Sequence, residues 1–233
     1  VFRPDHTPVK LWYIWWEDTI WIEEIPHEGH YKIIQIIRSA SKPIQQSLMH
    51  ALPLQEEFNE IENVFLPVSH EMKYGYISHR KEKTLHKVDL HSLRVISQVS
   101  LAPYDCHPLS LAFVEKVGLV VIQCGQSNIS QPDSQLILDY LSDTVLSFDT
   151  GIHGIPTVSA SNQYIVSVEP TLGRFFVQKV NSKEVTSMHF IDEYLPLSAW
   201  TTDFSTTNNV LLFGISSFSE QLVKVNITSK EVS

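Results

Sequence analysis

The sequence has little positive charge and no long apolar segment. Its 233 residues include 17 Lys or Arg against 26 Asp or Glu, which gives a formal net charge of −9. Because no cluster of basic residues could neutralise a phosphate backbone, no nucleic acid partner is expected. Even the aromatic-rich residues 11–22 are interrupted by Glu17 and Asp18, so no segment reaches the roughly 18 apolar residues of a membrane helix. No membrane span is expected.

Catalytic motifs are also missing. The serine nucleophile elbow, the phosphate-binding loop, the dinucleotide fingerprint and the helical zinc motif do not occur. The nearest approach to a metal site is His-Glu-Gly-His at residues 27–30, but its glycine and the preceding Pro26 mark a turn. Two imidazoles in a turn lack the fixed third ligand of a zinc site. We therefore predict that this segment is not an enzyme and that it holds no cofactor or metal.

Alternation of apolar and polar residues is what the sequence has in quantity. Hydrophobic residues make up 43% of the chain, which is enough for a sizeable core. β-Branched and aromatic residues recur with the period of two that is typical of strands, as in residues 84–90. The only segment that favours a helix is residues 47–65, where Pro53 limits the first part. The sequence therefore predicts an all-β protein.

One pattern returns along the chain: an alternating apolar run, then Asp or Asn with a few polar residues, then a second β-branched run. It occupies residues 84–99, 175–190 and 221–233, with a less perfect copy at 135–148 and a looser hairpin at 19–37. The aliphatic residues before the turn are spaced by 138 − 88 = 50, 180 − 138 = 42 and 225 − 180 = 45 residues; they are Val88, Leu138, Val180 and Val225. A period of about 40–50 residues, with a few short strands in each unit, is the signature of β-propeller blades.

The repeat has a physical reason. A single blade cannot bury both of its apolar faces, so copies stacked around an axis shield one another, and the repeated pattern would be the outer hairpin of each blade. Asp89, Asn181 and Asn226 are expected to form the turns, because their short side chains bond nearby backbone groups. We predict a single β-propeller segment over residues 1–233, WD40/YVTN-like, with about five blades and a less regular insertion near 39–65. It would be part of a larger ring.

The aromatic cluster near residue 15 is the most unusual local feature. Bulky apolar residues would occupy both faces of a strand here, which is typical of an interior strand covered by neighbouring blades. The alternative is that one face is an exposed hot spot for a protein partner. The candidate partner-binding residues are then Trp12, Trp15, Trp16 and Trp21.

Cysteines and glycosylation sequons bear on the compartment. Cys106 and Cys124 lie 124 − 106 = 18 residues apart, which suits either a disulfide across neighbouring strands or two unrelated buried thiols. Sequons for N-glycosylation begin at Asn128 and Asn226. Together these features favour an oxidising, secretory compartment.

The stretch from Cys106 to Cys124 resembles the carboxy-terminal region of the long follistatin-related proteins, the follistatin-like four and five branch. The matching positions within it are Cys106, Pro108, Ser110, Leu111, Ala112, Gly118, Ile122 and Cys124. Scattered similarity continues through residues 75–90, 154–159 and 165–168, weakens at 11–19 and is nearly lost in 20–62. The Kazal-like, EF-hand and immunoglobulin modules of those proteins have no counterpart in this segment.

The resemblance implies a secreted, glycosylated modular protein whose propeller-like region binds other proteins. It implies a disulfide between Cys106 and Cys124, which would bracket a hairpin that turns near residues 116–118. Calcium would belong to EF-hands outside this segment. We therefore predict an extracellular protein-binding module with a protein or matrix ligand, possible roles being modulation of growth-factor or adhesion signalling. The alternatives are a propeller-type hydrolase with a metal in its central channel and an intracellular propeller scaffold.

Overall fold

The structure is a computed structural model. It describes residues 6–14, 19–26, 33–38, 50–51, 61–67, 69, 71–79, 82–92, 94–126, 129–159, 161–169, 174–181, 183–192, 197–202, 211–216, 222–226 and 231–232. The chain forms two compact units, Val1–Ala102 and Pro103–Ser233. The predicted single domain over residues 1–233 stays a prediction.

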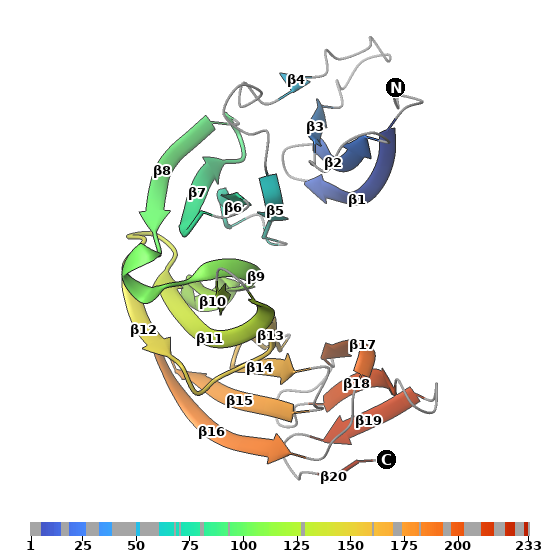
Figure 1. Ribbon diagram of the computed structural model, residues 1–233, viewed down its shortest axis with the longest axis vertical. Coiled ribbons are helices and arrows are strands. Elements are labelled where there is room, and N and C mark those ends of the chain that lie inside the picture. Colours follow the sequence, from blue (N-terminus) through green and yellow to red (C-terminus); the bar gives the residue numbers. More distant parts are fainter. Residues whose placement is uncertain are drawn as a thin grey trace. The chain divides into compact units, whose positions relative to one another are not determined.

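Among the described residues, the strands form five four-stranded antiparallel sheets, each built from consecutive strands (Figure 1). The first unit holds β1 (His6–Ile14), β2 (Thr19–Pro26), β3 (Ile33–Arg38) and β4 (His50–Ala51) in one sheet. Its second sheet contains β5 (Ile61–Phe65), β6 (Tyr74–His79), β7 (Thr84–Asp89) and β8 (Arg94–Ser100).

The second unit holds three sheets and two short 3-10 helices, η1 (Ala102–Tyr104), at its boundary with the first, and η2 (Glu115–Val117). The third sheet contains β9 (His107–Val114), β10 (Leu119–Gln126), β11 (Ile129–Asp139) and β12 (Val145–Asp149). The fourth contains β13 (Ile155–Val158), β14 (Tyr164–Glu169), β15 (Arg174–Asn181) and β16 (Glu184–Asp192). The fifth contains β17 (Leu197–Thr202), β18 (Leu211–Ser216), β19 (Leu222–Asn226) and β20 (Glu231–Val232).

The repeated sequence pattern is the hairpin of the third and fourth strands of a sheet. Its copies form β7 with β8, β11 with β12, β15 with β16, and β19 with β20. These four copies therefore predicted the second to fifth sheets correctly. The looser hairpin at 19–37 is formed by β2 and β3, the second and third strands of the first sheet, so it is not equivalent to the other four.

Residues 47–65, the one segment whose sequence favours a helix, are strand wherever the structure describes them. His50–Ala51 and Ile61–Phe65 are strands, and the rest of the segment, like most of the insertion predicted near 39–65, lies outside the described residues. The physical reason is sheet pairing. Phe65 lies opposite Tyr76 and Val64 opposite Ile77 on β6, so tertiary pairing overrides the helical spacing.

Burial changes from the middle strands to the outer strand of a sheet. Residues 75–79 of β6 and residues 119–125 of β10 are buried without interruption, so both faces of these strands are covered. The fourth strands β8 and β12 are largely exposed. This gradient is what a blade covered on both faces and open at its outer edge requires.

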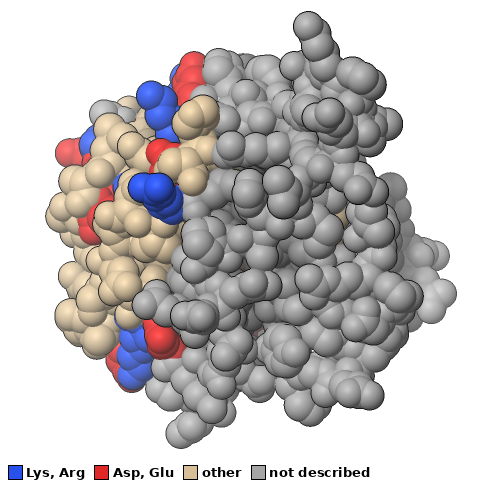
Figure 2. Space-filling model, turned by 90° about the horizontal axis from the view of Figure 1, so that it is seen from above, with Lys and Arg blue, Asp and Glu red and all other residues tan. Residues whose placement is uncertain are grey.

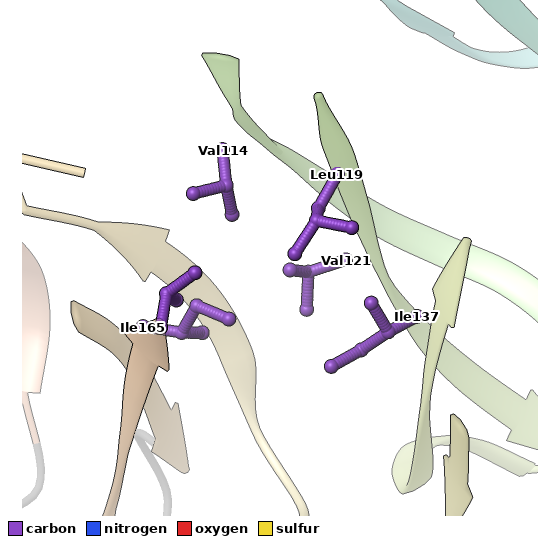
Figure 3. Packing of buried hydrophobic residues seen from close by; sticks show 6 residues of the cluster. Val114, Leu119, Val121, Ile137 and Ile165 are labelled. Carbon is purple, nitrogen blue, oxygen red and sulfur yellow. The ribbon is translucent and has the colours of Figure 1, made fainter. Parts of the chain in front are cut away.

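Adjacent sheets of the second unit pack through an aliphatic core. Val114, Leu119, Val121 and Ile137 of the third sheet meet Ile165 and Val180 of the fourth, and all six side chains are buried (Figure 3). The same two sheets are also joined by a row of hydrogen-bonded, buried polar side chains. Gln135 Nε2 donates to Gln178 Oε1 at 2.7 Å, and Ser167 Oγ donates to Gln135 Oε1 at 3.2 Å. These bonds satisfy groups that would be costly to bury alone, and they join the two sheets.

Candidate functional site

A disulfide braces the start of the third sheet. Cys106, just before β9, is bonded to Cys124 on β10, with 4.8 Å between their Cα atoms, and both residues are fully buried. The two strands lie in register beside it, with His107 opposite Gly125 and Pro108 opposite Cys124. The disulfide predicted from the family resemblance is confirmed, as is the hairpin that it brackets.

The turn of this hairpin runs through η2 and closes at Gly118. Gly118 has a φ of 68°, in the left-handed region that favours glycine, and its N–H donates to Val114 O at 3.0 Å. The neighbouring Lys116 N–H donates to Asn162 Oδ1 of the fourth sheet at 3.3 Å. The hairpin is therefore fixed at one end by the disulfide and at the other by a contact with the next sheet.

Turns that follow the third strand are formed by aspartate side chains. Asp89 Oδ1 accepts from Ser92 N–H at 2.6 Å, and Asp139 Oδ1 accepts from Leu141 N–H at 3.0 Å and Ser142 N–H at 2.9 Å. The turn-forming role expected for Asp89 is confirmed, and Asp139 is its equivalent in the third sheet.

Asp139 also pairs with a lysine from the next sheet. Its Oδ2 accepts a hydrogen bond from Lys183 Nζ, and the side chain of Asp139 is 7% exposed while that of Lys183 is 54% exposed. The lysine lowers the pKa of Asp139 from 3.8 to about 2; burial opposes the shift, and hydrogen bonds from Ser142 and Leu141 support it. The carboxylate is thus ionised at neutral pH and links the outer turns of two sheets.

Sequence reasoning missed a buried lysine. Alternation along β7 gives no sign that Lys87 is interior, yet it is 2% exposed. Its Nζ lies 4.9 Å from the ring centroid of Tyr74 and 5.8 Å from that of Tyr76, on the neighbouring strand β6. Aromatic faces attract a cation. Two tyrosines on one strand followed by a lysine on the next strand were therefore the sequence signal that could have indicated the buried lysine.

Exposed apolar residues gather on the outer strand of the third sheet. Leu146 is 44% exposed and Phe148 37% exposed, and Leu141 in the preceding turn is 73% exposed. The ring of Phe148 lies 5.3 Å from that of Tyr104, which ends η1. β12 pairs with β11 on one side and is the terminal strand of its sheet, so its other edge meets no strand of that sheet.

A β-bulge places Leu146 on this surface. In the pairing of β11 with β12, Leu138 lies opposite Val145 and Ile137 opposite Ser147, which leaves Leu146 as the extra residue. The second sheet has the same bulge, where Val88 lies opposite Val95 and Lys87 opposite Ser97, so the extra residue is Ile96. Ile96 is 50% exposed and stands 146 − 96 = 50 residues before Leu146.

The predicted aromatic hot spot is only partly within the described residues. Trp12 on β1 and Trp21 on β2 are Cα partners in register, whereas Trp15 and Trp16 lie outside the described residues. The structure does not describe the side chains of Trp12 and Trp21, so their role in partner binding stays a prediction.

Of the two predicted glycosylation positions, only Asn226 lies within the described residues. Asn128 lies outside the described residues. Asn226 is the last residue of β19, partly buried, and pairs in register with Leu211 and Glu231. Its occupancy by a glycan stays a prediction.

Within the described residues, no group of three or more His, Cys, Asp or Glu side chains could hold a metal ion. A search of the same residues for helices that are long and apolar enough to cross a membrane finds none. Lys, Arg, Asp and Glu side chains are interspersed over the described part of the face shown in Figure 2.

Comparison with known proteins places the fold. No family model matches the sequence. The structure is similar to KlAtg21 in its complex with the coiled coil of AgAtg16, with a TM-score of 0.60, 11% identity, and coverage of 92% of this chain and 65% of that one. It is also similar to a chain of a nidogen/laminin complex, with a TM-score of 0.57, 10% identity, and coverage of 98% of this chain and 79% of that one.

A WD40 domain from Toxoplasma gondii coronin matches with a TM-score of 0.57 and 9% identity over 93% of this chain and 56% of that one. The chain spans 59% to 65% of the length of the first Hsv2 and Atg21 chains that it matches. Identities this low establish the fold alone. With its antiparallel four-stranded sheets, the chain is a β-propeller protein, as its sequence period predicted.

Proposed function

We propose that this chain is a non-enzymatic, extracellular protein-binding module, part of a secreted glycoprotein of the follistatin-related kind. The observation that carries the proposal is the fully buried disulfide between Cys106 and Cys124 inside one propeller sheet. Disulfides persist in oxidising compartments and are rare in the cytosol, so this bond supports a secreted protein.

A binding role is supported by the fold. Two chains with similar structures are described in complexes with other proteins, one with the coiled coil of AgAtg16 and one in a nidogen/laminin complex. Propellers present several loops and outer strands around a rigid core, which suits recognition of a protein ligand. A protein or matrix ligand is therefore the partner class that we propose, with modulation of growth-factor or adhesion signalling as the process it would serve.

The compartment is tested by intact-mass measurement of the chain expressed through a secretory route. Reduction should add the mass of two hydrogens, and treatment with an N-glycanase should remove a glycan carried by Asn128 or Asn226. The variants Asn128→Gln and Asn226→Gln assign the glycan to its site, and each serves as the control for the other. Two free thiols together with no glycan on the secreted chain would contradict the proposal and favour an intracellular scaffold.

The binding role is tested separately with purified proteins. Extracellular proteins and matrix components are passed over the immobilised chain, and each one retained is purified and measured again in isolation. A specific complex with a Kd in the micromolar range or tighter is expected. Turnover of a substrate with no stable protein complex would refute the binding module.

A further inference from the structure

We infer that the outer strand of the third sheet is a docking site for a basic, apolar segment of a partner protein. The site, named here the β12 surface, consists of Tyr104, Leu146, Phe148 and Asp149. The inference rests on the proposed binding function, and it adds the place on the chain and the chemistry of the partner.

Leu146 and Phe148 of the β12 surface are exposed, although the neighbouring strand is buried. Residues 134–139 of β11 are buried, whereas residues 146–149 of β12 are exposed. Proteins commonly place charged side chains on an exposed edge strand. β12 instead has Leu146 and Phe148 there. Phe148 packs against Tyr104, so an aromatic pair stands beside an aliphatic side chain, a composition typical of interface anchors.

The bulge shows that this exposure is built into the fold. A bulge inserts one residue into an edge strand, bends the strand and re-aims a side chain. The bulges of β8 and β12 both present an aliphatic residue, Ile96 and Leu146, at the same place in the repeat. Because the ladder of β12 is interrupted at Leu146, we expect the partner to contact side chains rather than extend the sheet as a further strand.

The charge around the β12 surface indicates the partner's chemistry. The two segments that contribute to it, residues 102–107 and 140–153, contain Asp105, Asp143 and Asp149 and no Lys or Arg. Asp149 is exposed directly beside Phe148, with its Oδ1 accepting from Gly151 N–H at 2.7 Å. A segment with Lys or Arg next to bulky apolar residues complements this surface.

The test uses the full chain and selected peptides. Random peptides displayed on phage are enriched on the wild-type chain, and the double variant Leu146→Ser/Phe148→Ser is kept for the measurements that follow. Enriched peptides should carry net positive charge and at least one large aliphatic or aromatic residue. A synthetic copy of the strongest peptide should bind the double variant about tenfold or more weakly than wild type. Its affinity for Asp149→Asn should also fall, and added salt should weaken binding to wild type.

The matched control is Ile96→Ser, which removes the equivalent bulge residue of the second sheet and should leave binding unchanged. Circular dichroism and thermal unfolding of each variant are measured alongside, and the exposed substitutions are expected to preserve the fold. Enrichment of neutral or acidic peptides would overturn the inference, as would affinities that the double variant does not change. Self-association of the wild-type chain in sedimentation velocity that the double variant abolishes would assign the surface to a second copy and overturn it as well.

Failure of the inference is distinguishable from failure of the proposed function. If an extracellular ligand identified with the purified chain binds the double variant as tightly as wild type, the binding module stands and the β12 surface is wrong. If no protein ligand binds, the proposed function itself fails.

Discussion

Removal of the disulfide should destabilise the second unit and leave the first one unchanged. The bond between Cys106 and Cys124 closes a loop with a sequence separation of 18 residues. In the chain-entropy treatment, release of such a loop lowers the free energy of unfolding by about 3 kcal/mol. The sulfurs are fully buried, so the variant Cys106→Ala/Cys124→Ala also leaves a cavity and should lose about 1 kcal/mol more than the reduced wild-type chain.

Hydrogen exchange measured by mass spectrometry resolves this effect along the chain. Amides of β9 and β10 should exchange about a hundredfold faster after reduction, since each 1.4 kcal/mol corresponds to about tenfold in an equilibrium constant. Amides of β6 and β7, in the first unit, are the internal control and should not change. Tryptophan fluorescence is a poor probe here, because Trp12, Trp15, Trp16 and Trp21 belong to the first unit and Trp200 is the single tryptophan of the second.

Two results would contradict this prediction. Equal loss of protection in β6 and β10 would show that the disulfide stabilises the chain as a whole rather than its own hairpin. A change of less than about 1 kcal/mol in the second unit would show that the hairpin is already ordered in the unfolded ensemble, which removes the entropic basis of the estimate.

Asp139, Gly154 and Lys87 each provide a test by a single substitution. Asp139 has a lowered pKa, so its contribution is present above pH 3.8 and is lost as the pH falls towards about 2. Asp139→Asn should therefore cost about 1 kcal/mol at pH 7, because Lys183 is half exposed. Near pH 2 the carboxyl of the folded chain is only half ionised, so the substitution should cost a small fraction of that. Urea unfolding across this range measures both losses, and equal losses at the two pH values would contradict the ion pair. Gly154→Ala should cost more than about 2 kcal/mol in thermal unfolding, because φ is 103° and the new Cβ would lie 2.5 Å from the carbonyl carbon of Val168. Gly118→Ala is the matched control. Its φ is 68° but its Cβ would meet open space, so it should cost about 1 kcal/mol. Similar losses for the two glycines would rule out the steric argument. Lys87→Met keeps the buried stem and removes the charge near Tyr74 and Tyr76, so we expect a loss of about 0.5–2 kcal/mol, and a more stable variant would show that the ammonium is a net cost.

The sequence contained enough to predict the sheets because their hairpins repeat a physical requirement. Val88, Leu138 and Val180 recur before a turn that needs an Asp or Asn, and each marks the third strand of its sheet. Alternation alone therefore located the outer hairpins. The disulfide was left open by spacing and was decided by the resemblance around Cys106 and Cys124.

What the sequence did not predict depends on pairing between strands. Lys87 is interior because β6 and β7 are both covered, and alternation cannot show which polar residue lies under a neighbour. The bulges at Ile96 and Leu146 arise from the register of two strands, which no single strand reveals. Comparison of the two repeats at their offset of 50 residues was the one sequence signal that could have indicated the β12 surface.

The consecutive order of strands within each sheet has a consequence for how the chain folds. In the part of the chain that the structure describes, each ladder joins strands that are consecutive along the chain, so these pairings are local and the entropy lost in closing each loop is small for an all-β protein. Cys106 and Cys124 belong to one such hairpin, and their thiols can meet once that hairpin has left the ribosome. Oxidation during synthesis would then fix the register of β9 against β10 before the strands that follow are made.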